Sequence, residues 1–286
     1  MSLLLMLWLS VVPQGELLVK GAMPSASDAS TPVPEQGSVA AGRYRNAYFG
    51  LTYPIPAGWT EQPAGPPPSD GGAYVLTQFA LYGPDRRLRA HVLVTAQDLF
   101  FTLLEAADAK ELLAAARRGA ESQYVIESGP AEVTIAGRTF HRLGYRAPRS
   151  GLQWRVLSTD TRCHALTFTF TGTDPALLDA AERGLSAISL ADTAPACVNG
   201  YALGDNVVER TDPMFATNRY NTIPVRLLVD AKGRVKHIHL LSAFPEQSQA
   251  ILAALRTWRF KPYRVGGKAV EVETGMLFGN PRPAIH

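Results

Sequence analysis

Apolar and polar positions alternate in short stretches through residues 44–190, and this period of two is typical of half-buried β-strands. One stretch covers residues 50–55 and ends at Pro56. The later stretches come in pairs around tight turns. They predict three antiparallel hairpins: residues 73–81 with 88–96, 132–135 with 138–146, and 152–158 with 163–171.

Two other stretches in this part of the chain carry apolar residues at helical spacing. Asp108 precedes the first, with Glu111 at capping-box distance, and Asp174 precedes the second, with Pro175 in its first turn. An antiparallel sheet with flanking helices belongs to the α+β class, so we expect an α+β domain over residues 44–190.

Residues 221–280 predict a second, smaller domain. Apolar stretches at 223–230 and 235–241 flank a tight turn, and a helix begins at Pro245. Its apolar face repeats at helical spacing through Ile251, Leu252, Leu255 and Trp258. A last strand, residues 269–278, follows a Gly-Gly turn, which gives the order β-β-α-β.

The N-terminal segment, residues 1–21, contains the apolar run 3–12, which has the length of a signal-peptide core. No basic residue precedes this run, since the first is Lys20. We expect export to the periplasm with removal of roughly the first 25–30 residues. The alternative is that the run forms an apolar first helix of the fold. Residues 22–43 are rich in Ser, Ala and Pro and predict a flexible linker.

Composition narrows the class of protein. The chain has 286 residues, of which 46% are hydrophobic and 19% charged, which excludes a disordered protein. The length suggests two domains, which we place at 44–190 and 221–280, with a connector at 191–220 and a tail at 281–286. The net charge of +3 is too small for a dedicated nucleic-acid binder. No apolar run reaches the roughly 20 residues of a transmembrane helix.

The two cysteines exclude both a disulfide-dense scaffold and a cysteine zinc site. An exported protein with two cysteines usually pairs them, so we expect a disulfide between Cys163 and Cys197. This bond would pin the connector to the first domain. The alternative is a half-buried Cys163 and a free Cys197.

The sequence shows no catalytic or cofactor motif, such as G-x-S-x-G, G-x-G-x-x-G, H-E-x-x-H or C-x-x-C. His237 and His239 share one face of a predicted strand, but two ligands make only half a metal site. We expect both to be solvated. His141 and His164 lie on separate predicted strands. We therefore expect no enzyme, no metal and no cofactor.

Basic residues are concentrated in the C-terminal part, where residues 221–286 contain ten Lys or Arg and four Asp or Glu. Five of them cluster around the helix exit and the turn that follows: Arg256, Arg259, Lys261, Arg264 and Lys268. One interpretation is a surface for an acidic partner, such as a receptor segment or lipid head groups. The other is a solvated face that also compensates the helix dipole.

Residues 49–59, FGLTYPIPAGW, resemble the start of PsbP-like domains, where a strand enters a proline-bearing turn and then Gly-Trp. The order of predicted strands and helices up to residue 190 is also similar. The resemblance implies an antiparallel sheet with flanking helices in an exported, often non-catalytic protein. Trp59 is expected to be a core aromatic residue.

Residues 225–280 resemble the C-terminal domain of TonB-type energy transducers. The resemblance includes the turn at Gly233, the Leu241-Ser242 step, the WRFKP run 258–262 and the GGK turn 266–268. It implies a cell-envelope protein whose sheet edge binds a peptide segment of an outer-membrane TonB-dependent receptor. The family's membrane-spanning helix, proline-rich spacer and Tyr-Pro motif are not found, so energy transduction is not implied.

The last predicted strand, residues 269–278, is the expected edge for such a peptide. Val270, Val272 and Thr274 alternate with Glu271, Glu273 and Gly275 along this strand. The residues expected to form the peptide-binding edge are Val270, Glu271, Val272, Glu273, Thr274, Gly275 and Met276. Like charges opposite each other destabilise a strand pair, so the two glutamates are expected to oppose self-association. The alternative is a homodimer through this strand.

The sequence therefore predicts a non-enzymatic periplasmic protein that binds a partner by strand addition. The alternative is a small-ligand carrier or a hydrolase that uses a cleft in the first domain. A deep pocket there would favour the alternative.

Overall fold

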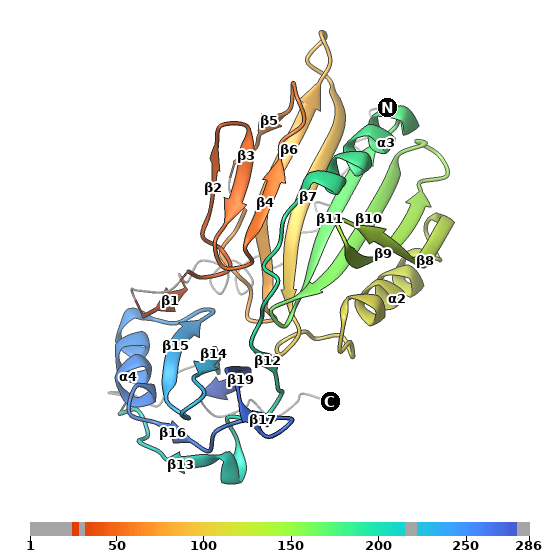
Figure 1. Ribbon diagram of the computed structural model, residues 1–286. Coiled ribbons are helices and arrows are strands. Elements are labelled where there is room, and N and C mark those ends of the chain that lie inside the picture. Colours follow the sequence, from red (N-terminus) through yellow and green to blue (C-terminus); the bar gives the residue numbers. More distant parts are fainter. Residues whose placement is uncertain (1–24, 29–31, 64, 215–221, 279–286) are drawn as a thin grey trace, which may run out of the picture.

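The computed structural model describes residues 25–28, 32–63, 65–214 and 222–278, and it has two α+β domains joined end to end (Figure 1). The predicted signal segment 1–21 and tail 281–286 lie outside the described residues. Within the described ranges, no helix is long and apolar enough to cross a membrane.

The first domain is built on a seven-stranded antiparallel sheet in the order β5-β6-β7-β11-β10-β9-β8. Its strands are β5 (Thr60–Glu61), β6 (Ala73–Tyr82), β7 (Leu88–Asp98), β8 (Val125–Ile135), β9 (Arg138–Arg146), β10 (Gln153–Thr161) and β11 (His164–Gly172). The three expected hairpins are present as β6–β7, β8–β9 and β10–β11. A three-stranded sheet, β2 (Gly37–Ala40), β3 (Arg43–Asn46) and β4 (Leu51–Pro54), completes the β-structure.

Two capped helices flank this sheet. Helix α2 (Ala109–Ala120) begins where Asp108 accepts a hydrogen bond from the Glu111 backbone N–H at 2.8 Å. Helix α3 (Pro175–Arg183) is capped by Asp174, and a short 3-10 turn, η1 (Gly184–Ala187), follows it. Leu178 and Ala181 of α3 enter the main core, and Trp59 packs against that core.

The second domain has a five-stranded sheet in the order β1-β15-β14-β19-β12. Its members are β1 (Ala26–Ser27), β12 (Ala196–Cys197), β14 (Ile223–Val229), β15 (Val235–Leu240) and β19 (Val272–Phe278). Helix α4 (Pro245–Leu255) covers one face with a core around the fully buried Trp258. The expected β-β-α-β order appears as β14, β15, α4 and β19.

Short elements complete the second domain. Strand β13 (Val207–Glu209), which follows the 3-10 turn η2 (Gly204–Asn206), pairs with β16 (Arg259–Phe260). Strands β17 (Arg264–Val265) and β18 (Lys268–Ala269) form a small hairpin. In Figure 1 these elements lie at the end of the second domain that is remote from the first domain.

The segment 22–43 differs from the expected flexible linker in its described part. Ala26 pairs with Leu240 in the second domain, and β2 pairs with β3 in the first. The Val33 side chain is buried. The composition of this segment offers little apolar surface, but two open sheet edges supply hydrogen-bond partners for its backbone.

Candidate functional site

The strand expected as a free edge is shorter than predicted and partly covered. Strand β19 begins at Val272, so Val270 and Glu271 precede it. Strand β12 lies parallel to β19, beside Val272 and Glu273. The Ala196 N–H donates to the Glu271 carbonyl at 2.9 Å, and the Val198 N–H donates to the Glu273 carbonyl at 3.0 Å. The connector thus occupies the position that we had expected to be open.

The remaining part of the β19 edge lies beyond the end of β12. The carbonyls of Glu271 and Glu273 point toward β12, and backbone groups alternate sides along a strand, so those of Gly275 and Leu277 point the same way. Among the described residues, no backbone hydrogen bond is made to Gly275 or Leu277 on this side. Leu277 is 58% exposed, whereas Gly275 is buried, and a Cβ at Gly275 would meet the Phe100 side chain at 2.5 Å.

A groove of about 560 Å³ lies beside this uncovered part of β19. It is lined by Ala202, Leu203, Gly204, Val207, Arg210, Asp212, Pro213, Met276, Leu277 and Phe278. The connector after β12 therefore forms one wall, and the end of β19 forms the other. Leu203 and Val208 of this connector are also exposed.

The two glutamates do not both face solvent as expected. Glu271 pairs with Lys236 at 2.6 Å on the surface. Glu273 is only 3% exposed and accepts a hydrogen bond from Arg226 Nη2 at 2.8 Å. It also pairs with Arg162 of the first domain. The prediction that Glu273 opposes self-association is wrong, because the first domain covers this face of the sheet.

Glu273 belongs to a buried ion network between the two domains. Arg226 Nη1 donates to Asp98 Oδ2 of the first domain at 2.5 Å, and all three side chains are at least 95% buried. Burial raises the pKa of Asp98, although the Arg226 charge opposes this. Arg162 donates to the Tyr48 carbonyl at 2.8 Å and stacks 4.0 Å from the centre of the Tyr48 ring. This network fixes the orientation of the second domain on the first.

The histidines also differ from expectation. His239 is buried, with Nε2 3.2 Å from Glu35 Oε1 and its ring near Tyr74. Its predicted exposure is wrong because the first domain and the segment before β2 cover that face. His164 is completely buried, and burial together with Arg226 lowers its pKa well below the usual range. In the described ranges, no three His, Cys, Asp or Glu side chains are grouped as metal ligands.

The predicted cysteine pair is joined by a disulfide in the structure, with Cα atoms 5.5 Å apart. It links the turn between β10 and β11 to β12. The turn residues Arg162 and Cys163 have φ values of 47° and 60°, in the left-handed region that non-glycine residues rarely adopt. Cys163 is buried, whereas Cys197 is exposed.

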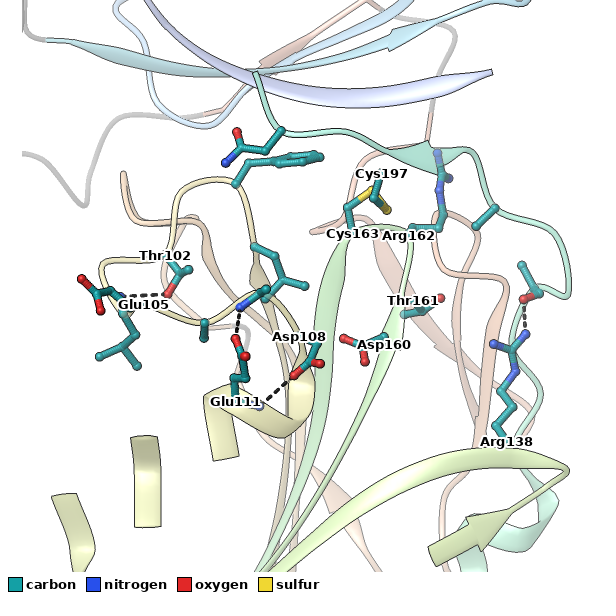
Figure 2. A pocket seen from close by; sticks show the side chains of 18 of the residues that line it. Thr102, Glu105, Asp108, Glu111, Arg138, Asp160, Thr161, Arg162, Cys163 and Cys197 are labelled. Atoms are coloured by element: carbon teal, nitrogen blue, oxygen red, sulfur yellow. Dashed lines mark hydrogen bonds between the residues drawn. A yellow bond between two sulfur atoms is a disulfide. The ribbon is translucent and has the colours of Figure 1, made fainter. Parts of the chain in front are cut away.

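A cavity of about 810 Å³ lies next to this disulfide, at the end of the first domain (Figure 2). Residues 99–107, the start of α2, the end of β10 and the connector line it. Asp160 accepts a hydrogen bond from the Ala109 N–H at 2.8 Å, and burial raises the pKa of this carboxyl. Arg138 donates to the Ala191 carbonyl on the opposite wall.

The chemistry of this cavity is limited by existing contacts. Asp108 and Glu111 accept hydrogen bonds from the backbone at the start of α2, as Figure 2 shows. The described lining contains no His, Ser or Lys, and its two cysteines form the disulfide. Its hydroxyl side chains are those of Thr102 and Thr161, and Thr102 Oγ1 accepts a hydrogen bond from the Leu104 N–H at 3.2 Å.

The predicted basic cluster divides into two groups. Arg259 donates to the carbonyls of Arg256, Thr257 and Trp258 and so caps the end of α4. Arg264 donates to the Gly267 carbonyl. Exposed positions are held by Arg256, Lys261, Arg264 and Lys268, and within the described chain none of them forms an ion pair with an acidic side chain. Both interpretations of the cluster therefore have support.

Among the comparisons with known proteins, only the comparison with solved structures found matches. No family model and no curated protein matches the sequence. The solution structure of a cyanobacterial PsbP, CyanoP from Synechocystis sp. PCC 6803, is 16% identical and has a TM-score of 0.38, covering 55% of this chain and 97% of that one. PsbP is the family that residues 49–59 resemble.

Two other solved structures have similar levels of likeness. LpqN of Mycobacterium tuberculosis, which is involved in cell envelope biogenesis, is 14% identical with a TM-score of 0.35, covering 58% of this chain and 91% of that one. PA94 of Pseudomonas aeruginosa, a protein of unknown function, is 16% identical with a TM-score of 0.32, covering 55% and 98%. Below a TM-score of 0.5, these likenesses establish no function. Nothing found shows a likeness to the TonB C-terminal domain.

Proposed function

We propose that this is a non-enzymatic protein of the periplasm that binds an extended segment of another envelope protein as an added strand on β19. The observation that carries the proposal is the outward edge at Leu277, which is 58% exposed and lies beside the 560 Å³ groove. The sequence resemblance of residues 225–280 favours a segment of an outer-membrane TonB-dependent receptor as the partner, and hence a link to transmembrane transport.

The edge and the groove have complementary tasks in strand addition. Outward N–H and C=O groups of β19 supply main-chain hydrogen bonds, which give affinity for any extended peptide. Side chains of the peptide enter the groove, where Leu203 offers apolar surface and Arg210 and Asp212, which pair with each other at 2.6 Å, form a polar rim. This division gives specificity at alternate positions of the bound strand.

A non-catalytic role is supported by the larger cavity, because three of its acidic side chains already accept hydrogen bonds from the backbone. A second candidate function is that of a small-ligand carrier, because the volume of about 810 Å³ lies within the roughly 300–1,000 Å³ of ligand pockets. Its acidic groups Asp108, Glu111 and Asp160 are held by the backbone at the start of α2. We therefore favour the strand edge.

The test compares two substitutions at one exposed position. Leu277→Pro removes an outward N–H donor, whereas Leu277→Ala removes the side chain and keeps the donor. Each variant and the wild type are immobilised and then incubated with envelope extract. Their folding is checked separately by thermal denaturation. We expect the proline variant to lose the captured partner and the alanine variant to retain most of it. Equal capture by both variants, with both folded, contradicts strand addition at this edge.

A further inference from the structure

Strand β12 is attached to the second sheet by few interactions of its own. It has only two residues in its parallel pair with β19, and in addition to that pairing the Ala196 and Val198 N–H groups donate to the Glu271 and Glu273 carbonyls. By contrast, β14 pairs with β19 over seven residues. Ala196 and Val198 pack only partly against the core, and Cys197 is exposed.

The rest of the connector adds little support near β12. Ala191 is fixed to the first domain, where its N–H donates to the Phe49 carbonyl at 3.1 Å. The next well-buried residue is Tyr201 of the second domain. Between these two points, the disulfide is the only covalent bond from the connector to a folded element among the described residues.

We infer that the Cys163–Cys197 disulfide is a clamp that holds β12 over the β19 edge, and that reduction of this bond releases β12. Release adds the outward groups of Glu271 and Glu273 to those of Gly275 and Leu277. The edge available to an extended peptide then includes the start of β19 as well as Leu277. The effect on a partner rests on the proposed function, whereas the release of β12 does not.

The disulfide is placed where a reductant can reach it. Both cysteines line the 810 Å³ cavity, and Figure 2 shows them beside Arg162. A thiolate of a dithiol oxidoreductase attacks the exposed Cys197 Sγ, and Cys163 leaves as a thiolate. The second thiol of the reductant then resolves the mixed disulfide. In total, two electrons and two protons pass to the cysteine pair, and the reductant becomes a disulfide.

The surroundings of Cys163 suit the reduced state as well. Its Sγ lies 3.5 Å from Glu273 Oε2, so the thiol formed by reduction can donate a hydrogen bond to this carboxylate. Arg162 and Arg226 balance the charge of Glu273 in either state. The ion network between the domains therefore does not depend on the disulfide, and the domains stay docked when β12 leaves.

Amide hydrogen exchange by NMR tests the release of β12. The samples are the oxidised protein, the same protein reduced with a dithiol, and the double variant Cys163→Ser with Cys197→Ser. We expect the amides of Ala196 and Val198 to exchange at least tenfold faster without the disulfide. Amides in the β14–β19 and β10–β11 ladders should change less than twofold. Unchanged exchange at Ala196 and Val198, or an equal rise throughout, overturns the clamp and leaves a structural disulfide.

A second measurement separates the clamp from the proposed function. A peptide with the sequence of residues 194–199, with serine replacing Cys197, is added to the oxidised and reduced forms. Binding at least tenfold stronger to the reduced form, with shifts at Gly275 and Leu277, supports both proposals. Released β12 without any peptide binding contradicts strand addition alone. Equal binding to both forms contradicts the clamp as a control of this edge.

Discussion

Removal of the Arg226 guanidinium is the most informative perturbation of the domain junction. Its side chain is 5% exposed and contacts Asp98 at 2.5 Å and Glu273 at 2.8 Å, and these acids are 0% and 4% exposed. Arg226→Met keeps the approximate volume but leaves two buried carboxylates without their shared cation. Breaking a buried pair in this way typically costs about 3–5 kcal/mol.

The contacts that remain after the substitution place the expected loss of stability at the lower end of this range. Asp98 keeps a hydrogen bond from the Phe100 N–H at 2.8 Å, and Glu273 keeps Arg162. We therefore expect a loss of about 3 kcal/mol in the free energy of unfolding at pH 7, measured by urea denaturation. The double variant Arg226→Met with Asp98→Asn should recover part of this loss, because one buried charge is removed.

The pH dependence of this variant provides a further check. Without Arg226, burial raises the pKa of Asp98 above its unfolded value, so the protonated form is favoured in the folded state. The loss in free energy of unfolding of the variant relative to the wild type is then smallest below about pH 4, and this loss grows as pH rises from there. An Arg226→Met protein within about 1 kcal/mol of wild type at pH 7, with no pH dependence of the difference, refutes the stabilising role of the network.

Four further outcomes are expected. The lowered pKa of His164 means that the unfolded state binds more protons, so stability should fall by up to about 1.4 kcal/mol per pH unit below roughly pH 6.5, and His164→Gln should flatten this slope in urea titrations. Asp108→Ala removes the N-cap of α2 and should cost about 1 kcal/mol in thermal denaturation, whereas Asp108→Ser should cost less. Thiol labelling of the native protein without reductant should modify neither Cys163 nor Cys197, and labelling of both contradicts the disulfide. The N-terminal mass of protein from the cell envelope should lack roughly the first 25–30 residues, and an intact Met1 on a cytoplasmic species contradicts export.

The sequence predicts helices and strands well where the spacing of apolar residues and the residue types at the turns favour the same element. The β-β-α-β order of the second domain follows from two alternating stretches around Gly233 and from the apolar face of α4. Gly233 has a φ of 79°, and a Cβ there would meet the Phe260 carbonyl at 1.9 Å, so the glycine is required. Local chemistry and the final structure are consistent at such positions.

Turn positions were less predictable where ordinary residues adopt left-handed conformations. The expected hairpin of residues 152–158 with 163–171 put the β10–β11 turn between residues 158 and 163, but β10 runs on to Thr161 and the turn lies at Arg162 and Cys163. No glycine or asparagine marks this turn. The contacts that hold it, between Arg162 and Glu273 and between the two cysteines, come from the other domain and the connector. Local sequence therefore cannot reveal it.

The ion network and the cover on β19 depend on docking of the domains. An arginine inside the apolar run 223–229 is the one local signal, because a charge at a buried strand position requires a partner. Its partners Asp98 and Glu273 are 128 and 47 residues away in sequence. Likewise, β12 pairs with a strand about 75 residues later, through backbone groups that every sequence has.

Site-specific photo-crosslinking in the cell envelope tests the proposed binding edge most directly. A photoreactive phenylalanine analogue replaces Leu277 beside the groove or, as a control, Leu88, which is similarly exposed at 57% on β7 of the first domain. Strand addition predicts a crosslink from position 277 to an extended segment of one envelope protein, and none to that segment from position 88. Crosslinks to the same segment from both positions, or none from position 277 in folded protein that captures its partner, contradict the account.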